Sequence, residues 1–137
     1  MIELSLLKSI NEGTKDERLS ALARAAAHAI FPAVDPRMVN NHIHTSYSFS
    51  PYSPAAAVYA ARAEGLATCG IVDHDSIGGA EEFIEAGKIV GIPTTIGIET
   101  RVSFAETAFC DRRTNNPDQI GNSYMVLHAV PHANIKT

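Results

Sequence analysis

The stretch SPAAAVYAARAEGLATCGIVDHDS, residues 53–76, contains the signals for one helix followed at once by one strand. Ser53 is a residue type that caps a helix N-terminus, Pro54 suits the first helical turn, and Gly65 suits the position just past the helix end. The next run, ATCGIVD (67–73), is short and apolar, which predicts a buried strand. A helix that leads into a buried strand is the unit of a parallel α/β sheet, so this stretch indicates the fold class.

The same alternation continues on both sides of this stretch. RMVNNHIH (37–44), PTTIGIE (93–99) and SYMVLHAV (123–130) predict three further strands, and SIGGAEEFIEAGKIVG (76–91) predicts another helix. Residues 101–122 mix polar, Gly and Pro residues and predict a long loop. The pattern therefore predicts an α/β fold with about four parallel strand units.

Two helices are expected ahead of the first strand. Residues 2–10 carry apolar side chains at helical spacing, and Thr14 and Glu17 form a capping box that starts a second helix. We therefore divide the chain into a helical hairpin, residues 1–36, and a β/α domain, residues 37–137. We expect the hairpin to cover a sheet edge or the barrel bottom, because open sheet edges need covering.

Composition excludes several classes of protein. The 137 residues are 45% hydrophobic and 19% charged, which is typical of a globular protein of one domain. The net charge of −4 provides no basic stripe, so we expect no nucleic-acid partner. We expect no membrane span, no secretory signal, a cytoplasmic location, and a buried free thiol at Cys69.

Residues able to bind a metal collect at the ends of the predicted strands. They are His44, Asp73, His74, Asp75, Glu99 and His128. The C-terminal ends of parallel strands gather at one face, where α/β proteins build their active sites. Residues i and i+2 of a strand point to the same side, so His42 and His44 are expected to share one ion or two adjacent ions.

The chemistry of these side chains predicts which metals are bound. Imidazole and carboxylate ligands without a thiolate suit Zn, Mn or Fe better than Ca or Mg. The ligands exceed what one tetrahedral ion needs, so we expect two or more ions, with Glu99 able to bridge them. Asp73 and Asp75 are expected to orient His74 or a water, and we assign catalytic roles to Asp73 and Glu99.

The motifs HIHTSYS (42–48), GIVDHDS (70–76) and GIE (97–99), in this order, resemble those of the polymerase and histidinol phosphatase (PHP) superfamily. The resemblance implies a distorted, TIM-like (β/α) barrel, here a partial one, with two or three metal ions and phosphoesterase chemistry. Carried over by position, it implies the metal ligands His42, His44, His74 and Glu99, with Glu99 bridging. A histidine of the next strand is also implied. His128 is the nearest candidate, and His132 is less favoured because it lies beyond the strand.

The chain departs from the family pattern in two respects. SFSPYSP (48–54) stands where an acidic or histidine ligand is expected, so one ion of a three-metal cluster is expected to be missing or weakly held. The later barrel strands, which carry further ligands, are not in these 137 residues. We therefore expect either a piece of a longer protein or a natural half barrel, and a homodimer or higher oligomer that covers the open edge.

These observations predict a metal-dependent phosphoesterase that acts on a small phosphorylated substrate. The alternative is a metal-binding or oligomerising half-barrel module without catalysis. An amidohydrolase-like enzyme ranks lower, because no lysine lies on the second to fourth predicted strands. Arg101, Arg112 and Arg113 are either phosphate-binding groups or charges of a solvated loop, and the solvated loop is favoured.

Overall fold

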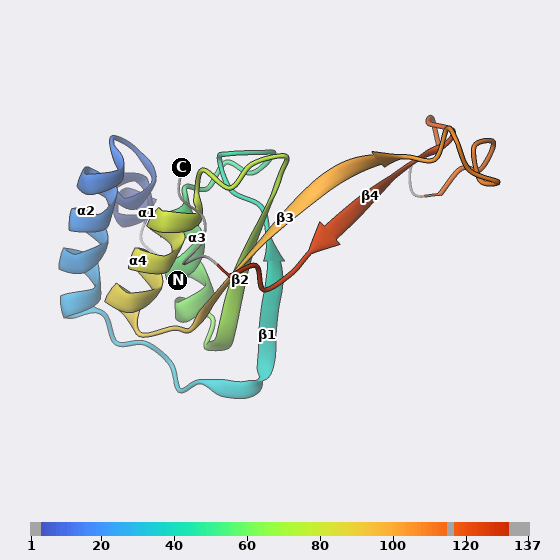
Figure 1. Ribbon diagram of the computed structural model, residues 1–137. Helices are drawn as coiled ribbons and strands as arrows, with labels where there is room; N and C mark the ends of the chain where they lie inside the picture. The colour runs from blue at the N-terminus through green and yellow to red at the C-terminus, as the bar shows by residue number, and fades with distance from the viewer. Residues whose placement is uncertain (1–3, 115–116, 132–137) are drawn as a thin grey trace.

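The computed structural model describes residues 4–114 and 117–131, which form a layer of helices on one side of a sheet (Figure 1). In chain order the elements are α1 (Leu4–Asn11), α2 (Lys15–His28), β1 (Asp35–Ile43), α3 (Pro54–Ala63), β2 (Leu66–His74), α4 (Ala80–Val90), β3 (Thr94–Ser103) and β4 (Asn122–Leu127). No helix within the described ranges combines the length and the apolar character needed to cross a bilayer.

Local capping explains where the helices begin and end. The Ser53 hydroxyl accepts a hydrogen bond from the Ala56 amide at 3.1 Å at the start of α3. The capping box of α2 is present, with the Thr14 amide donating to Glu17 Oε2 at 2.8 Å. Gly91 ends α4 in the left-handed conformation, with φ of 72°, which glycine adopts without steric cost. The predicted helix starts at Ser53 and Thr14 are therefore confirmed.

The sheet has the order β1-β2-β3-β4, and its direction changes at the last strand. β1, β2 and β3 are parallel, whereas β4 pairs with β3 in the antiparallel direction. The predicted α/β half barrel is confirmed, but the prediction that all four strands are parallel is wrong for β4. A parallel neighbour needs a crossover, usually a helix, and residues 104–121 contain none among their described positions. The chain turns back instead, and β3 and β4 form a ribbon that projects from the body (Figure 1).

The N-terminal helices pack on the helix layer, not on the sheet edge or the barrel bottom as expected. α2 contacts α4, and α1 contacts α3. Ile10 of α1 and Leu22 of α2 are fully buried in one apolar cluster with Val58 and Phe83. Burying these apolar faces against α3 and α4 explains the placement. The division of the chain into residues 1–36 and 37–137 stays a prediction.

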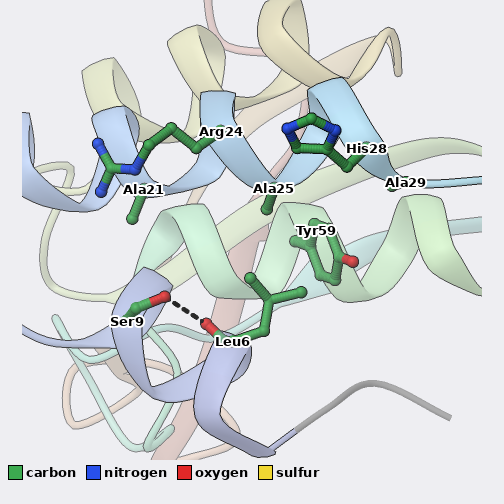
Figure 2. A pocket seen from close by; sticks show the side chains of 8 residues that line it. All are labelled: Leu6, Ser9, Ala21, Arg24, Ala25, His28, Ala29 and Tyr59. Atoms are coloured by element: carbon green, nitrogen blue, oxygen red, sulfur yellow. Dashed lines mark hydrogen bonds between the residues drawn. The ribbon is translucent and has the colours of Figure 1, made fainter.

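A hollow lies within this helix layer, between α1, α2 and α3 (Figure 2). Its volume is about 370 Å³, and it is lined by Leu6, Ser9, Ala21, Arg24, Ala25, His28, Ala29 and Tyr59. The alanine side chains of α2 are small and leave this space open. Arg24 and His28, also on α2, line it as well. His28 therefore belongs to the helix layer and not to the face of the sheet that carries His42, His44 and His74.

Cys69 is buried and free, as predicted, and Cys110 is exposed. Burial raises the pKa of the Cys69 thiol to about 12, so the reactive thiolate is scarce at neutral pH. We expect a thiol reagent to label Cys110 and spare Cys69 in the native protein, and to label both after unfolding. Mass spectrometry of the labelled peptides measures this. Labelling of both cysteines at similar rates in the native state would contradict the placement of Cys69.

Candidate metal centre

The face of the sheet that points away from the helices carries His42, His44 and His74, and we call it the open face. Ile71 of β2 and Ile96 of β3 pack against the helices. Their neighbours Val72 and Gly97 therefore point to the open face, because side chains alternate along a strand. By the same alternation, His74 and Glu99 lie on the open face.

A bulge in β1 brings His42 to this face. Asn40 pairs with Cys69 and Ile43 pairs with Ile71, so two residues of β1 lie opposite a single residue of β2. A bulge of this kind changes the direction of a side chain. As a result, the imidazoles of both His42 and His44 reach the Glu99 carboxylate, while Ile43 packs toward the helices.

Glu99 is the centre of the cluster. Its Oε2 atom lies 3.0 Å from His42 Nε2, 3.4 Å from His44 Nε2 and 3.8 Å from His74 Nε2. The ligand atoms of His42, His44 and Glu99 all lie within 4.8 Å of one another, which is a spacing that can hold a metal ion. β1, the residue that follows it, β2 and β3 thus place three imidazoles and one carboxylate close together. Imidazole and carboxylate ligands together suit divalent transition metals.

The surroundings of His44 favour its neutral imidazole, which is the form that binds metals. Burial lowers the pKa of His44, and the positive charges that His74 and His42 would carry lower it further. The His44 and His74 rings are stacked, with centroids 4.8 Å apart and planes 3° apart. Since the folded-state pKa of His44 lies below its ordinary value, the ring stays unprotonated at neutral pH with a lone pair available.

His128 reaches the same region from the opposite direction. It follows β4, and its ring lies 6.0 Å from that of His42 between centroids. β3 continues beyond Glu99 to Ser103, so the reversed β4 returns along β3 and ends near Gly97. A side chain at Gly97 would overlap the Leu127 carbonyl oxygen, so glycine permits this close approach. His128 as a ligand stays a prediction, and His132 lies outside the described residues.

The Asp73 carboxylate bonds to the loop that follows β1, and its expected role in orienting His74 or a water stays a prediction. This carboxylate is 1% exposed and accepts hydrogen bonds from the Thr45 amide and hydroxyl, both at 2.6 Å, and from the Ser48 hydroxyl at 2.7 Å. Ser48 Oγ also lies 3.4 Å from His44 Nδ1. Asp73 therefore holds the loop after β1 and, through Ser48, the ring of His44.

The roles of Thr45 and Ser48 were not predicted, and Ser48 entered only as part of SFSPYSP (48–54), where an expected ligand is absent. The run of hydroxyl residues directly after the histidine pair could have indicated these roles. A buried carboxylate needs hydrogen-bond donors, and hydroxyl groups can supply them. Asp75 has a different partner, and its Oδ1 accepts from the Thr100 hydroxyl at 2.8 Å. This contact ties the end of β2 to the residue that follows Glu99.

We expect Asp73→Asn to weaken metal binding by roughly tenfold or more, because groups that orient ligands change metal affinity by about 10–100-fold. The NH₂ group of asparagine is a hydrogen-bond donor, and it would face the donor groups of Thr45 and Ser48. The hydrogen bonds that position Ser48, and through it His44, would be weakened. Competition with a chromogenic chelator measures the affinity. Asp75→Asn is the matched control and should have the smaller effect. An equal or larger loss in the control would contradict the role given to Asp73.

Comparisons with known proteins show which family has the same motifs and fold. Residues 40–133 match the PHP domain family. Error-prone DNA polymerases of Mycobacterium bovis and Mycobacterium tuberculosis are 35% identical over 92 residues, which is 66% of this chain and 8% of theirs. A 5'-3' exoribonuclease of Haemophilus influenzae is 38% identical over 58 residues, which is 42% of this chain and 21% of that protein.

One solved structure is similar in fold and in sequence. It is a protein of Bifidobacterium adolescentis assigned by inference as a metal-dependent phosphoesterase, with a TM-score of 0.50 and 27% identity. The match covers 66% of this chain and 27% of that one. This chain therefore spans less than a third of the length of each of these proteins.

Proposed function

Because this chain belongs to the PHP domain family, we propose that it binds divalent metal ions at the open face and hydrolyses phosphoesters. The observation that carries the proposal is the placement of three imidazole nitrogens around one oxygen of Glu99, at 3.0, 3.4 and 3.8 Å. A carboxylate charge and several imidazole lone pairs this close together are typical of a site that binds cations.

The residues present fit transition-metal ions. His42, His44, His74 and Glu99 would hold them, and His128 is close enough to His42 to contribute. This number of ligands exceeds the need of one tetrahedral ion, so we propose two or more ions of Zn, Mn or Fe. Bound there, they would supply Lewis-acid activation of water and neutralisation of charge on a phosphoryl group.

We propose that the substrate is a small phosphorylated molecule and that Glu99 and Asp73 have different roles toward it. Glu99, which is buried, would place its negative charge between the imidazoles of His42 and His74. The contacts of Asp73 support a positioning role, exerted through Thr45 and Ser48, in place of direct contact with substrate. Glu99 is then the carboxylate that would face the reacting atoms.

The test is turnover of a phosphomonoester by metal-stripped protein to which Mn²⁺ or Zn²⁺ is added back. We expect activity only with metal. His74→Ala should lower the activity by at least about tenfold, because even the loss of a residue that only orients a metal ligand typically lowers activity by about 10–100-fold. Full activity of His74→Ala would contradict the site. Metal binding without turnover under any metal would favour the alternative, a non-catalytic metal-binding module.

We also propose that the chain forms a homodimer or higher oligomer in the cytoplasm. β1 and β4 are the two edges of the sheet, and the exposed apolar side chains of β1 include Met38 and Val39, 45% and 56% exposed. Exposed strand edges are templates for pairing with another chain. Solution scattering tests this, and a monodisperse monomer at high concentration would contradict it.

A further inference from the structure

The hollow between α1, α2 and α3 lies in the helix layer, on the side of the sheet opposite to the proposed metal centre (Figure 1, Figure 2). Its volume of about 370 Å³ falls within the range of about 300–1,000 Å³ that is typical of pockets for small molecules. Each of the three helices contributes side chains to its wall, and none of the described residues that line it is acidic. The hollow therefore differs from the open face both in its place and in its chemistry.

Helix α2 presents two adjacent rows of side chains to the hollow. Ala21, Ala25 and Ala29 form the first row, and Arg24 and His28 form the second. Residues four positions apart are neighbours along a helix surface, with Cβ atoms about 5–6 Å apart. The apolar row and the basic row therefore run side by side along the same wall.

The two basic side chains of this wall have no partner in the part of the chain that the structure describes. The side chains of Arg24 and His28 make no ion pair, hydrogen bond or ring contact with another described residue. A guanidinium has five N–H donors, and an imidazole has at least one in either of its forms. His28 lies in the last turn of α2, where the helix dipole favours a basic residue, so further evidence for a ligand is needed.

Tyr59 of α3 provides that evidence. Tyr59 is 7% exposed and lines the hollow, and its ring meets the Phe31 ring edge to face, with centroids 5.7 Å apart. Its hydroxyl has no hydrogen-bond partner among the described residues, although buried tyrosine hydroxyls usually have one. Every described polar side-chain atom that is closed to solvent has a partner. The Tyr59 hydroxyl therefore opens to solvent-accessible space, which is the hollow that its side chain lines.

We propose that this hollow binds a small amphipathic carboxylate, such as a medium-chain fatty acid. Arg24 would bind the carboxylate by forked hydrogen bonds, and His28 and the Tyr59 hydroxyl would donate to it as well. The hydrocarbon tail would lie on the alanine row of α2 and on Leu6 of α1. Ser9 is already engaged, since its hydroxyl donates to the Leu6 carbonyl oxygen at 2.8 Å. The unpartnered polar groups can all donate hydrogen bonds and the permanent charge is positive, which favours an anion over a cation or a neutral lipid.

The first experiment titrates the full chain, free of metal, with octanoate and follows the backbone amides by NMR. We expect saturable shifts in α1, α2 and α3. 1-Octanol and octylammonium, which have the same tail without the negative charge, should bind more weakly. Equal affinity for all three compounds, or no saturable binding of octanoate, would overturn the proposal and leave the phosphoesterase function standing. Binding of octanoate only after Zn²⁺ is added would place it at the metal centre and would also overturn the proposal.

The second experiment measures octanoate affinity in variants. Arg24→Gln should weaken binding by about tenfold or more, because a hydrogen bond to a charged group is lost. Lys8→Gln removes the same charge from an exposed residue of α1 outside the lining, and it should bind octanoate as the wild type does. Ala25→Leu fills the hollow and should abolish binding. Equal losses in Arg24→Gln and Lys8→Gln, or wild-type affinity in Ala25→Leu, would overturn the proposal.

Tyr59→Phe separates binding from folding. Because the Tyr59 hydroxyl has no partner among the described residues, its removal should leave the midpoint of thermal unfolding unchanged in the absence of octanoate. The same variant should bind octanoate roughly two- to tenfold more weakly, which is the usual effect of losing one neutral hydrogen bond. Unchanged affinity for octanoate, or a lower unfolding midpoint without it, would contradict the role given to Tyr59.

Discussion

Glu99→Ala is expected to lower the affinity for Zn²⁺ or Mn²⁺ by at least about a hundredfold, above the range seen for residues that only orient metal ligands. Glu99 Oε2 is the single atom that the imidazoles of His42, His44 and His74 all approach. Without it, three imidazoles face one another with no negative charge among them, and bringing in a cation becomes less favourable. Isothermal titration with each metal, and elemental analysis of the purified protein, measure the loss.

Two further variants separate charge from shape at Glu99. Glu99→Gln keeps the size of the side chain but removes the charge, and we expect it to lose most of the affinity as well. Glu106→Gln removes the same charge from an exposed residue in the β3–β4 connection and should leave metal binding unchanged. Wild-type affinity in Glu99→Gln would show that the carboxylate charge is not needed, which would contradict the centre described.

Arg18→Ala is expected to reduce the free energy of unfolding by about 3–5 kcal/mol, as removal of one partner of a buried ion pair does. The Glu82 side chain is 1% exposed, and Arg18 Nε donates to its Oε1 at 2.9 Å. The same oxygen accepts from the Ala55 amide at 3.2 Å, so Glu82 joins α4 to α2 and α3. The hydrogen bond to Glu82 is the main reason why the pKa of Arg18 is raised. Chemical denaturation measures the change.

The chain offers a matched control one turn earlier on α2. Lys15 also pairs with a glutamate of α4, Glu81, at 2.8 Å, but both side chains are largely exposed, at 42% and 77%. Because exposed pairs are screened by water and salt, Lys15→Ala should change stability little. Replacing Arg18 with Met and Glu82 with Leu together should recover much of the loss, since no buried charge is then left unpaired. Equal destabilisation by Arg18→Ala and Lys15→Ala would contradict the buried pair.

The sequence by itself determined the helices, the first three strands and the order of the motifs. Helix caps are local, since Ser53 and Thr14 bond to amides three residues away. The apolar run before Asp73 predicts a buried strand for a similar reason, because its pattern lies within a few residues. The placement of His44, His74 and Glu99 near one another followed from a general rule, that parallel strands end at one face.

Only the tertiary structure decided the direction of β4, the bulge in β1 and the partners of Asp73. The direction of β4 depends on pairing with β3 across an 18-residue connection, 104–121, and not on the composition of β4 itself. The bulge exists only relative to the register of β2. Asp73 meets Thr45, 28 residues earlier in the chain, so no local pattern indicates that bond. Periodicity and capping act over a few residues, whereas register and hydrogen-bond partners are set by packing between distant segments.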